Sequence, residues 1–252
     1  MREAGHTFLA RMGKKRLRPG GKLATEWLLD KGSFGPATSV LEVACNMGTT
    51  AIELVRRFDC TIVACDIDPA ALEKAEKNVH SAKLAEKITL LHADATSLPF
   101  ENASFDVVLN EAMLTMLPLS RKEKAVSEYF RVLKPGGLLL THDVLLTVSD
   151  PEEQRRIYSE LSGAINSPVV PLTREKWEGL FTGAGFASPE SLTGPMSLMS
   201  LSGMIYDEGL CNTIRVIFRS LASADRKMFL NMRKVFSQRA SQLWFIAACS
   251  RK

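Results

Sequence analysis

The sequence lacks any long apolar run, and this argues against a membrane-spanning helix. No uninterrupted apolar stretch of the 252 residues approaches the ~20 that a spanning helix needs. The most apolar region, Leu138 to Val148, is broken by His142 and Asp143. The first residues, MREAGHTFLARMGKKR, also lack the apolar segment of a signal peptide. We therefore expect no membrane span and a cytoplasmic location.

Cysteines are few and scattered, which argues against zinc and disulfide frameworks. None of the five forms a CxxC pair or joins a Cys/His cluster. Three lie in apolar, strand-like runs, where a free cysteine packs as a small hydrophobe. The five are Cys45, Cys60, Cys65, Cys211 and Cys249. We expect free thiols, in keeping with a reducing cytosol, and no metal site.

No single sign of charge dominates, because the formal net charge is only +4. With 46% hydrophobic and 24% charged residues, the composition is ordinary and excludes disordered and fibrous classes. The exception is a basic run near the start, which favours either contact with phosphates or an acidic substrate, or a solvated helix face, the commoner meaning of short charge runs. The run comprises Arg11, Lys14, Lys15, Arg16, Arg18 and Lys22.

Between residues 39 and 148, short apolar runs alternate with amphipathic segments. This alternation indicates crossover connections and a parallel sheet buried on both faces. We expect strands at 39–45, 60–65, 87–91, 105–109 and 137–141, with helices at 49–58, from Pro69 onward, and at 121–133.

In the last third of the sequence the regular alternation of strands and helices ends, and helices are predicted at 151–162, 173–184, 213–221 and 225–239. Strands are expected near 191–196 and at 242–248. A Met- and Ser-rich segment lies between, and its methionines are either core residues or part of a substrate wall. They are Met196, Met199 and Met204.

Polar residues gather where the predicted strands end, which is where a parallel α/β sheet binds its ligands. After the first strand, the segment from Glu42 to Thr49 forms a tight turn that opens a helix, whose N-terminus offers amide donors. Asp66 ends the second strand, about twenty residues past the turn, and is placed to accept from ribose hydroxyls. The later strand ends carry Asp94 and Ala95, then Asn110 and Glu111, then His142 and Asp143.

In order and spacing, these residues resemble the motifs of class I S-adenosylmethionine-dependent methyltransferases. The resemblance is greatest to the small-molecule enzymes of the ubiquinone/menaquinone-biosynthesis type. Their acidic-x-G/A-x-G-x-G turn is matched by Glu42 to Gly48, and their ribose-binding acid by Asp66, with Ile67 beside the adenine. Their Asp-Ala pair for the adenine amine is matched by Asp94 and Ala95. The FDVV strand and the RVLKPGG turn match residues 105–108 and 131–137, so the resemblance covers about 38–143.

A second similarity lies upstream, where Leu17 to Gly21, followed by Thr25, resembles the GG-x-x-x-T entry of enzymes whose N-terminal helix closes over the cofactor. The resemblance therefore implies one methyltransferase domain over 1–252: a helical lid (1–37), a cofactor-binding core (38–148), and substrate-side helices with the last strands (149–252). The implied fold is α/β, a Rossmann-like, doubly wound, mostly parallel seven-stranded sheet with helices on both faces and a helical insertion before the last strand. The implied cofactor is S-adenosyl-L-methionine. The residues implied to bind it are Gly20, Gly21, Glu42, Ala44, Asn46, Gly48, Asp66, Ile67, Asp94, Ala95 and Asn110.

The turn departs from the family pattern, because Ala44 and Asn46 replace its first and second glycines. Asparagine is the non-glycine residue that best tolerates positive φ, so we expect Asn46 to allow the turn. Its side chain occupies volume near the methionine part of the cofactor, which leaves loss of cofactor binding as an alternative.

Methyl transfer from a sulfonium needs in-line geometry and a dry site, and needs a base only for a protonated acceptor. The candidate proton handlers are Glu111, His142 and Asp143. Each also has a purely structural interpretation: Glu111 could belong to a solvated loop, and His142 with Asp143 could form a satisfied polar pair. Asp94, predicted to bind the cofactor, could instead cap a helix N-terminus. We interpret His6, His80 and His92 as structural or exposed. The small-molecule acceptor should lie under the N-terminal segment and residues 149–207.

Three other functions compete with this hypothesis. An RNA or protein methyltransferase could use the basic run, but the chain has no appended RNA-binding module and no basic stripe interleaved with aromatics, so a nucleic-acid partner is not expected. Residues 110–113 also do not resemble the Asn/Asp-Pro-Pro-aromatic motif of amino-base methylation. A cofactor-binding protein without turnover is supported only by Asn46. A NAD-dependent oxidoreductase would need a G-x-G-x-x-G turn, which is absent.

Overall fold

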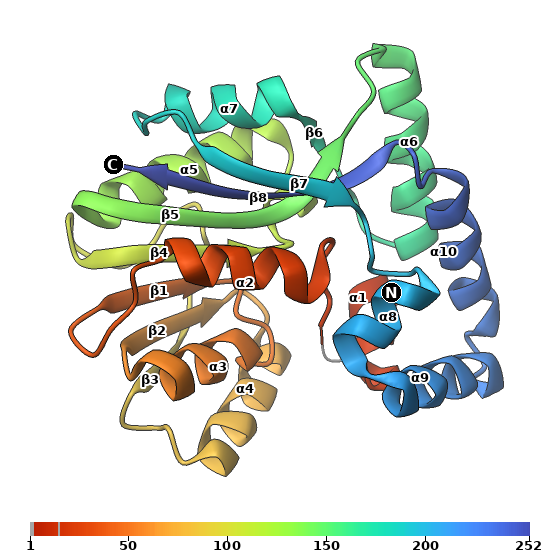
Figure 1. The fold of residues 1–252 in the computed structure, drawn as a ribbon, viewed down its shortest axis with the longest axis horizontal. Coiled ribbons are helices and arrows are strands. Elements are labelled where there is room, and N and C mark those ends of the chain that lie inside the picture. The colour runs from red at the N-terminus through yellow and green to blue at the C-terminus, as the bar shows by residue number, and fades with distance from the viewer. Residues whose placement is uncertain (1–2, 15) are drawn as a thin grey trace.

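A twisted β-sheet forms the centre of the computed structural model, which describes residues 3–14 and 16–252 (Figure 1). Its described strands follow the order β3-β2-β1-β4-β5-β8-β7, and β6 pairs with β5 off this path. The strands are β1 (Ser39–Val43), β2 (Thr61–Asp66), β3 (Ile88–His92), β4 (Phe105–Glu111), β5 (Leu133–Leu146), β6 (Leu172–Thr173), β7 (Glu190–Pro195) and β8 (Leu243–Arg251).

The predicted mostly parallel sheet is confirmed. Strands β1 to β5 pair in parallel, whereas β8 runs antiparallel to both of its neighbours, β5 and β7. The seven strands of the main path match the expected number, and the two-residue β6 adds an eighth within the described chain. Because the parallel strands are joined by crossovers, their carboxyl ends meet at one edge of the sheet.

Helices cover both faces of the sheet, as the doubly wound pattern predicts (Figure 1). One face packs against Leu28, Leu54 and Val79, and the other against Tyr129 and Trp177. The helices that carry them are α2 (Gly21–Lys31), α3 (Thr49–Phe58) and α4 (Pro69–Ala82) on the first face, and α5 (Leu119–Val132) and α7 (Arg174–Gly183) on the second.

A further block of helices lies beyond the carboxyl ends of the strands (Figure 1). Its core contains Phe8, Ile157, Met204 and Phe229, all less than 2% exposed. The block consists of α1 (Gly5–Met12), α6 (Pro151–Ile165), α8 (Leu201–Glu208), α9 (Leu210–Ala222) and α10 (Arg226–Gln238), and a 3-10 turn, η1 (Leu114–Met116), follows β4. The sequence did not predict α8, which Ser200 caps by accepting a hydrogen bond from the Gly203 amide.

Strands β4, β5 and β8 extend further than the apolar runs indicate. β5 continues past Thr141 to Leu146 because it pairs with β8 over that whole length. His142 and Asp143 therefore lie inside the strand, not after it, and both are 0% exposed. Glu111 is likewise the last residue of β4, and not part of a following loop.

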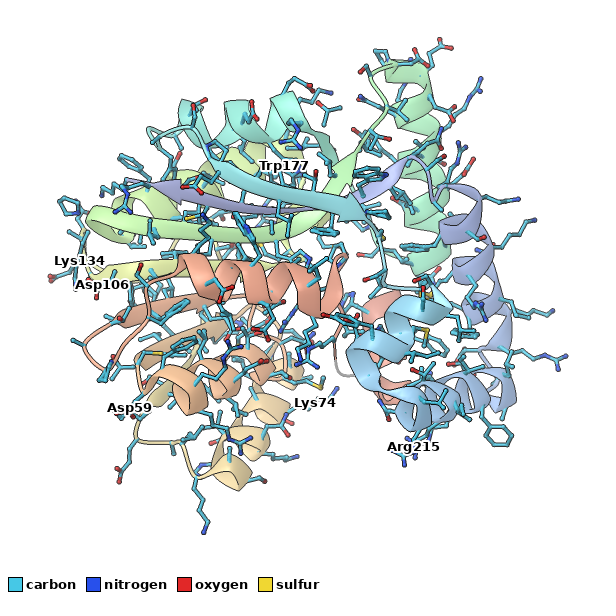
Figure 2. The ribbon with its side chains drawn as sticks, viewed as in Figure 1. Asp59, Lys74, Asp106, Lys134, Trp177 and Arg215 are labelled. Atoms are coloured by element: carbon cyan, nitrogen blue, oxygen red, sulfur yellow. The ribbon has the colours of Figure 1, made fainter. Side chains whose placement is uncertain are left out.

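At the other end of the strands, where β4 and β5 begin, the sheet carries ordinary surface contacts. One is the Lys134–Asp106 ion pair of 2.8 Å (Figure 2). In the described part of the chain, no helix is long and apolar enough to cross a membrane.

Candidate functional site

A cavity of about 400 Å³ lies at the carboxyl ends of β1, β2 and β4, beneath α1. Its volume falls in the range of small-ligand sites, roughly 300–1,000 Å³. The structure brings together here six of the residues that the sequence predicted for the site: Glu42, Ala44, Asn46, Asp66, Ile67 and Glu111.

The turn after β1 is held in an unusual backbone conformation. Ala44, Asn46 and Gly48 have φ values of 60°, 49° and 70°, so Asn46 adopts the left-handed region expected of it. Asp66 fixes this turn, because one carboxylate oxygen accepts from the Asn46 amide at 2.8 Å and the other from the Asp68 amide at 2.9 Å. Each oxygen keeps a second lone pair, so Asp66 can still accept from a ligand in the cavity that it lines.

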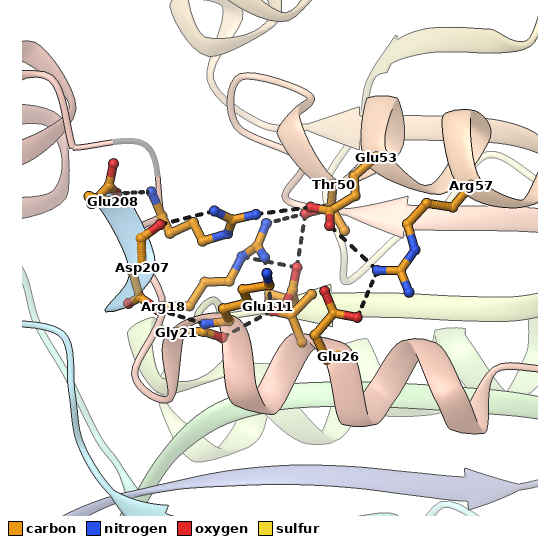
Figure 3. Close-up of polar contacts among 12 residues, drawn as sticks. Arg18, Gly21, Glu26, Thr50, Glu53, Arg57, Glu111, Asp207 and Glu208 are labelled. Carbon is orange, nitrogen blue, oxygen red and sulfur yellow. Dashed lines mark hydrogen bonds and ion pairs between the residues drawn. The ribbon is translucent and has the colours of Figure 1, made fainter. Parts of the chain in front are cut away.

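A buried guanidinium organises the cavity floor (Figure 3). Arg18, only 8% exposed, places its Nε 3.1 Å from Glu111 Oε2 and donates to the hydroxyls of Thr25 and Thr50. Those hydroxyls in turn donate to Glu111 at 2.8 and 2.9 Å. Burial alone would raise the pKa of Glu111, but the Arg18 charge and a hydrogen bond from His142 lower it to about 2. Glu111 is thus an ionised, saturated anchor.

The pKa of the Glu42 carboxyl is shifted in the opposite direction to that of Glu111. Glu42 is 5% exposed, and burial together with the nearby negative charge of Glu111 raises its pKa to about 8. Its Oε2 atom has no hydrogen-bond partner among the described residues. A buried acceptor without a partner is costly, so this oxygen is suited to a cationic or N–H donor of a bound ligand.

His142 connects the sheet to the segment before α2. The Gly20 amide donates to Nε2 at 2.9 Å, so Nδ1 carries the proton and faces Glu111 Oε1 at 3.3 Å. Gly20 must be a glycine, because a Cβ there would lie 2.5 Å from Phe245 Cγ. Gly21 has φ 53° and packs under the carboxylate of Asp207. His142, Gly20 and Gly21 therefore lie behind the cavity lining and fix the entry of α2.

A second, smaller cavity of about 100 Å³ adjoins the first. Its wall is almost entirely apolar, with residues from α1, α6, α10 and the segment at 196–198. Asp143 is its buried carboxyl; it accepts from the amides of Thr115 (3.1 Å) and Val144 (2.8 Å), and burial raises its pKa. Four residues line both cavities: His6, Leu17, Ala112 and Met116.

His6 is exposed, as expected from the sequence, but it also lines both cavities, which the sequence did not predict. It comes from α1 and lies at the junction of the two cavities. Although His6 is exposed at the protein surface, partial desolvation of its ring lowers the pKa from the usual 6.5, against the opposing influence of Asp66 and Asp68, and this favours the uncharged ring that can take up a proton. The sequence feature that could have indicated this role is the position of His6 in the predicted lid segment. The sequence likewise presents Arg18 as one member of a basic run. Its position directly before Pro19-Gly20-Gly21, in the predicted entry segment, could have indicated a role in the site.

Some predicted residues lie away from the cavity lining. Gly48 caps α3, and Asn110 donates to Thr141 Oγ1 at 3.0 Å inside the sheet. Asp94 forms an ion pair with Arg121 at 2.7 Å and accepts from the Thr96 amide, so it caps a turn and not a helix. Ala95, next to it, is buried in the core.

Only part of the basic run is a solvated helix face: Arg11 and Lys22 are exposed on α1 and α2, whereas Arg18 is buried. Besides Arg18, Lys14 is 1% exposed and lies 3.8 Å from Glu208, and Arg16 pairs with Glu53 at 3.4 Å. These side chains tie the N-terminal segment to α3 and α8, while Lys15 lies outside the described residues. The methionines divide between both interpretations: Met196 lines the apolar cavity, whereas Met199 and Met204 are core residues.

Comparison with known proteins identifies the family of this chain. Residues 40–137 match a family described as a methyltransferase domain. An uncharacterized protein of Haemophilus influenzae is 51% identical over 250 residues, 99% of this chain and 98% of that protein. The uncharacterized methyltransferase YodH of Bacillus subtilis is 30% identical over 188 residues, 74% of this chain and 76% of that protein. Among solved structures, a candidate sarcosine dimethylglycine methyltransferase of Galdieria sulphuraria superimposes with a TM-score of 0.79 at 20% identity over 98% of both chains.

The strand order, the strained turn after β1 and the carboxylate at the end of β2 define a Rossmann-like methyltransferase fold. The chain belongs to the class I S-adenosylmethionine-dependent methyltransferase family.

Proposed function

We propose that this protein transfers a methyl group from S-adenosylmethionine to a small, largely apolar acceptor. The observation that carries the proposal is a pair of adjoining cavities that share His6 at their junction: one contains many charged and polar side chains (the polar cavity), and the wall of the other is almost entirely apolar (the apolar cavity). A donor and an acceptor bound in the two cavities would meet where these cavities join. Such juxtaposition is the main requirement for methyl transfer.

The polar cavity fits the cofactor in charge. Asp66 would accept from the ribose hydroxyls, and the exposed side chain of Ile67 would lie against the adenine. The unpartnered Oε2 of Glu42 would accept from the ammonium group of the methionine part, and Arg18 would meet its carboxylate. The bound cofactor supplies a methyl group activated by the sulfonium charge.

The side chains around the junction would position the acceptor and handle its proton. The apolar wall excludes water, and Asp143 offers the polar group that orients an acceptor hydroxyl or amine. His6, uncharged at neutral pH, would take the proton that such a group releases as it attacks. We assign Glu111 and His142, both saturated by protein partners, to holding Arg18 and the entry of α2.

The size and character of the second cavity favour a small molecule over RNA. Its volume of about 100 Å³ and its apolar wall offer no groove for a phosphate backbone. The RNA or protein methyltransferase and the binding protein without turnover remain alternative functions that the experiment below distinguishes.

The test is transfer of isotope-labelled methyl from S-adenosylmethionine to fractions of small apolar metabolites, with RNA and protein fractions in parallel. We expect label in an apolar small molecule and formation of S-adenosylhomocysteine. Asp143→Asn should lose transfer while still binding S-adenosylhomocysteine. Label in RNA or protein, or cofactor binding without transfer to any fraction, would contradict the proposal.

A further inference from the structure

Exposed apolar side chains are concentrated in one region of the molecule. Of the eleven large apolar side chains that are exposed in the described chain, eight lie between residues 201 and 230. Four of them are on α9, at spacings of four, four and three residues, and so form one stripe along the helix. They are Leu210, Ile214, Phe218 and Leu221, of which Phe218 is 72% exposed.

Helices α9 and α10 are also strongly basic. They contain six basic residues and no acidic residue. All six are exposed, and none forms an ion pair within residues 3–14 and 16–252: Arg215, Arg219, Arg226, Lys227, Arg233 and Lys234. Figure 2 shows Arg215 on the outer side of α9, directed away from the body of the molecule.

A partner for this surface must desolvate the apolar stripe and also neutralise the cations. A second copy of the chain meets the first requirement but not the second, because a two-fold interface sets the same basic patch against itself. A nucleic acid meets the second but leaves the aliphatic Leu210 and Ile214 uncovered. An anionic bilayer meets both, since acyl chains receive the apolar stripe while headgroups receive the arginines and lysines.

We propose that the α9–α10 face, defined as α9 with the outward side of α10, docks on anionic lipid surfaces. The inward side of α10 supports this arrangement, because Met232 and Phe236 line the apolar cavity. One helix thus faces the bilayer on one side and the apolar cavity on the other. A bilayer-dissolved apolar molecule would have a short route into the protein.

The test is co-sedimentation of the full-length protein with vesicles of phosphatidylglycerol and phosphatidylcholine, and with vesicles of phosphatidylcholine alone. We expect salt-sensitive binding to the anionic vesicles and much weaker binding to the neutral ones. Phe218→Ser should weaken partitioning about tenfold or more by removing apolar area. The R215Q/R219Q double variant should weaken it about 25-fold, at about fivefold per charge.

Matched controls are Leu119→Ser, an exposed leucine on α5, and K77Q/K124Q, two exposed lysines on α4 and α5. Both should bind vesicles like the wild type, and all variants should keep the wild-type melting temperature. Absence of wild-type binding to anionic vesicles would overturn the proposal. Binding of both Phe218→Ser and R215Q/R219Q as strong as that of the wild type would also overturn it. A wild-type dimer in light scattering that Phe218→Ser dissociates, or preferential binding to RNA, would also overturn it. No acceptor is needed, so the result is independent of the proposed methyl transfer.

Discussion

Two neighbouring carboxyls of the larger cavity, Glu42 and Glu111, should make the stability of the protein depend on pH in opposite directions. Glu42 has an ordinary pKa of 4.5 in the unfolded chain and about 8 in the folded protein, because it is buried next to the negative Glu111. Between these values the unfolded chain has lost the proton that the folded protein keeps. The stabilising contribution of protonated Glu42 is therefore complete below pH 4.5 and is lost as the pH rises toward 8.

The magnitude follows from the width of this window. Each pH unit between the two pKa values changes the free energy of unfolding by about 1.4 kcal/mol. From pH 5 to pH 8 the change is therefore roughly 4 kcal/mol. Glu111 has its pKa lowered to about 2, so its contribution is present above pH 4.5 and lost only below it. A series from pH 5 to pH 8 thus reports on Glu42 and not on Glu111.

Urea unfolding of the ligand-free protein over this pH series measures the effect, with Glu42→Gln as the variant. Glutamine keeps the shape of the side chain but cannot titrate. We expect the variant to gain roughly 4 kcal/mol relative to the wild type between pH 5 and pH 8. Glu123→Gln, at an exposed position on α5, controls for removal of a negative charge. If wild type and Glu42→Gln differ by a constant amount at every pH, the assignment of a protonated buried Glu42 is refuted.

Three further outcomes are expected. Binding of S-adenosylmethionine at pH 7 should release a proton from Glu42, seen as buffer-dependent heat in calorimetry and absent in Glu42→Gln; buffer-independent heat in the wild type would contradict it. Gly20→Ala should destabilise the protein by roughly 1–3 kcal/mol in thermal unfolding, because the added Cβ would meet Phe245. Gly163→Ala, which has open space on α6, should not destabilise it, and equal effects of the two substitutions would contradict the packing argument. With an acceptor in hand, His6→Gln should lower kcat by about 10²–10⁴-fold and remove the loss of rate at acidic pH while leaving S-adenosylhomocysteine affinity nearly unchanged; an unchanged kcat would exclude His6 as the base.

The sheet and the turn that lines the larger cavity could be predicted because their signals are local. The turn from Glu42 to Gly48 and the acid at Asp66 follow apolar runs whose length and composition define strands. The ends of β4 and β5 could not be found in this way. His142 and Asp143 are polar, and only pairing with the distant β8 keeps them inside a strand.

The apolar cavity, the proposed acceptor side, could not be predicted because it is built from contacts between segments far apart in the sequence. His6 acquires its place only when α1 packs against the helical block and above the end of the sheet. Arg18 looked like one charge in a basic run, and its role depends on Glu111 and Thr50, 93 and 32 residues away. The position of Asn46 was predictable, because its conformation is set by its own backbone preference.

The most direct test of the central claim is calorimetric titration with S-adenosylhomocysteine, with NAD as the control ligand. We expect binding of S-adenosylhomocysteine and none of NAD. Asp66→Ala should weaken the affinity roughly 10- to 100-fold, since it removes the carboxylate that we propose to bind the ribose. Asp106→Asn, at the opposite edge of the sheet (Figure 2), should bind like the wild type. Absence of binding by both S-adenosylhomocysteine and S-adenosylmethionine, or unchanged affinity in Asp66→Ala, would contradict the account.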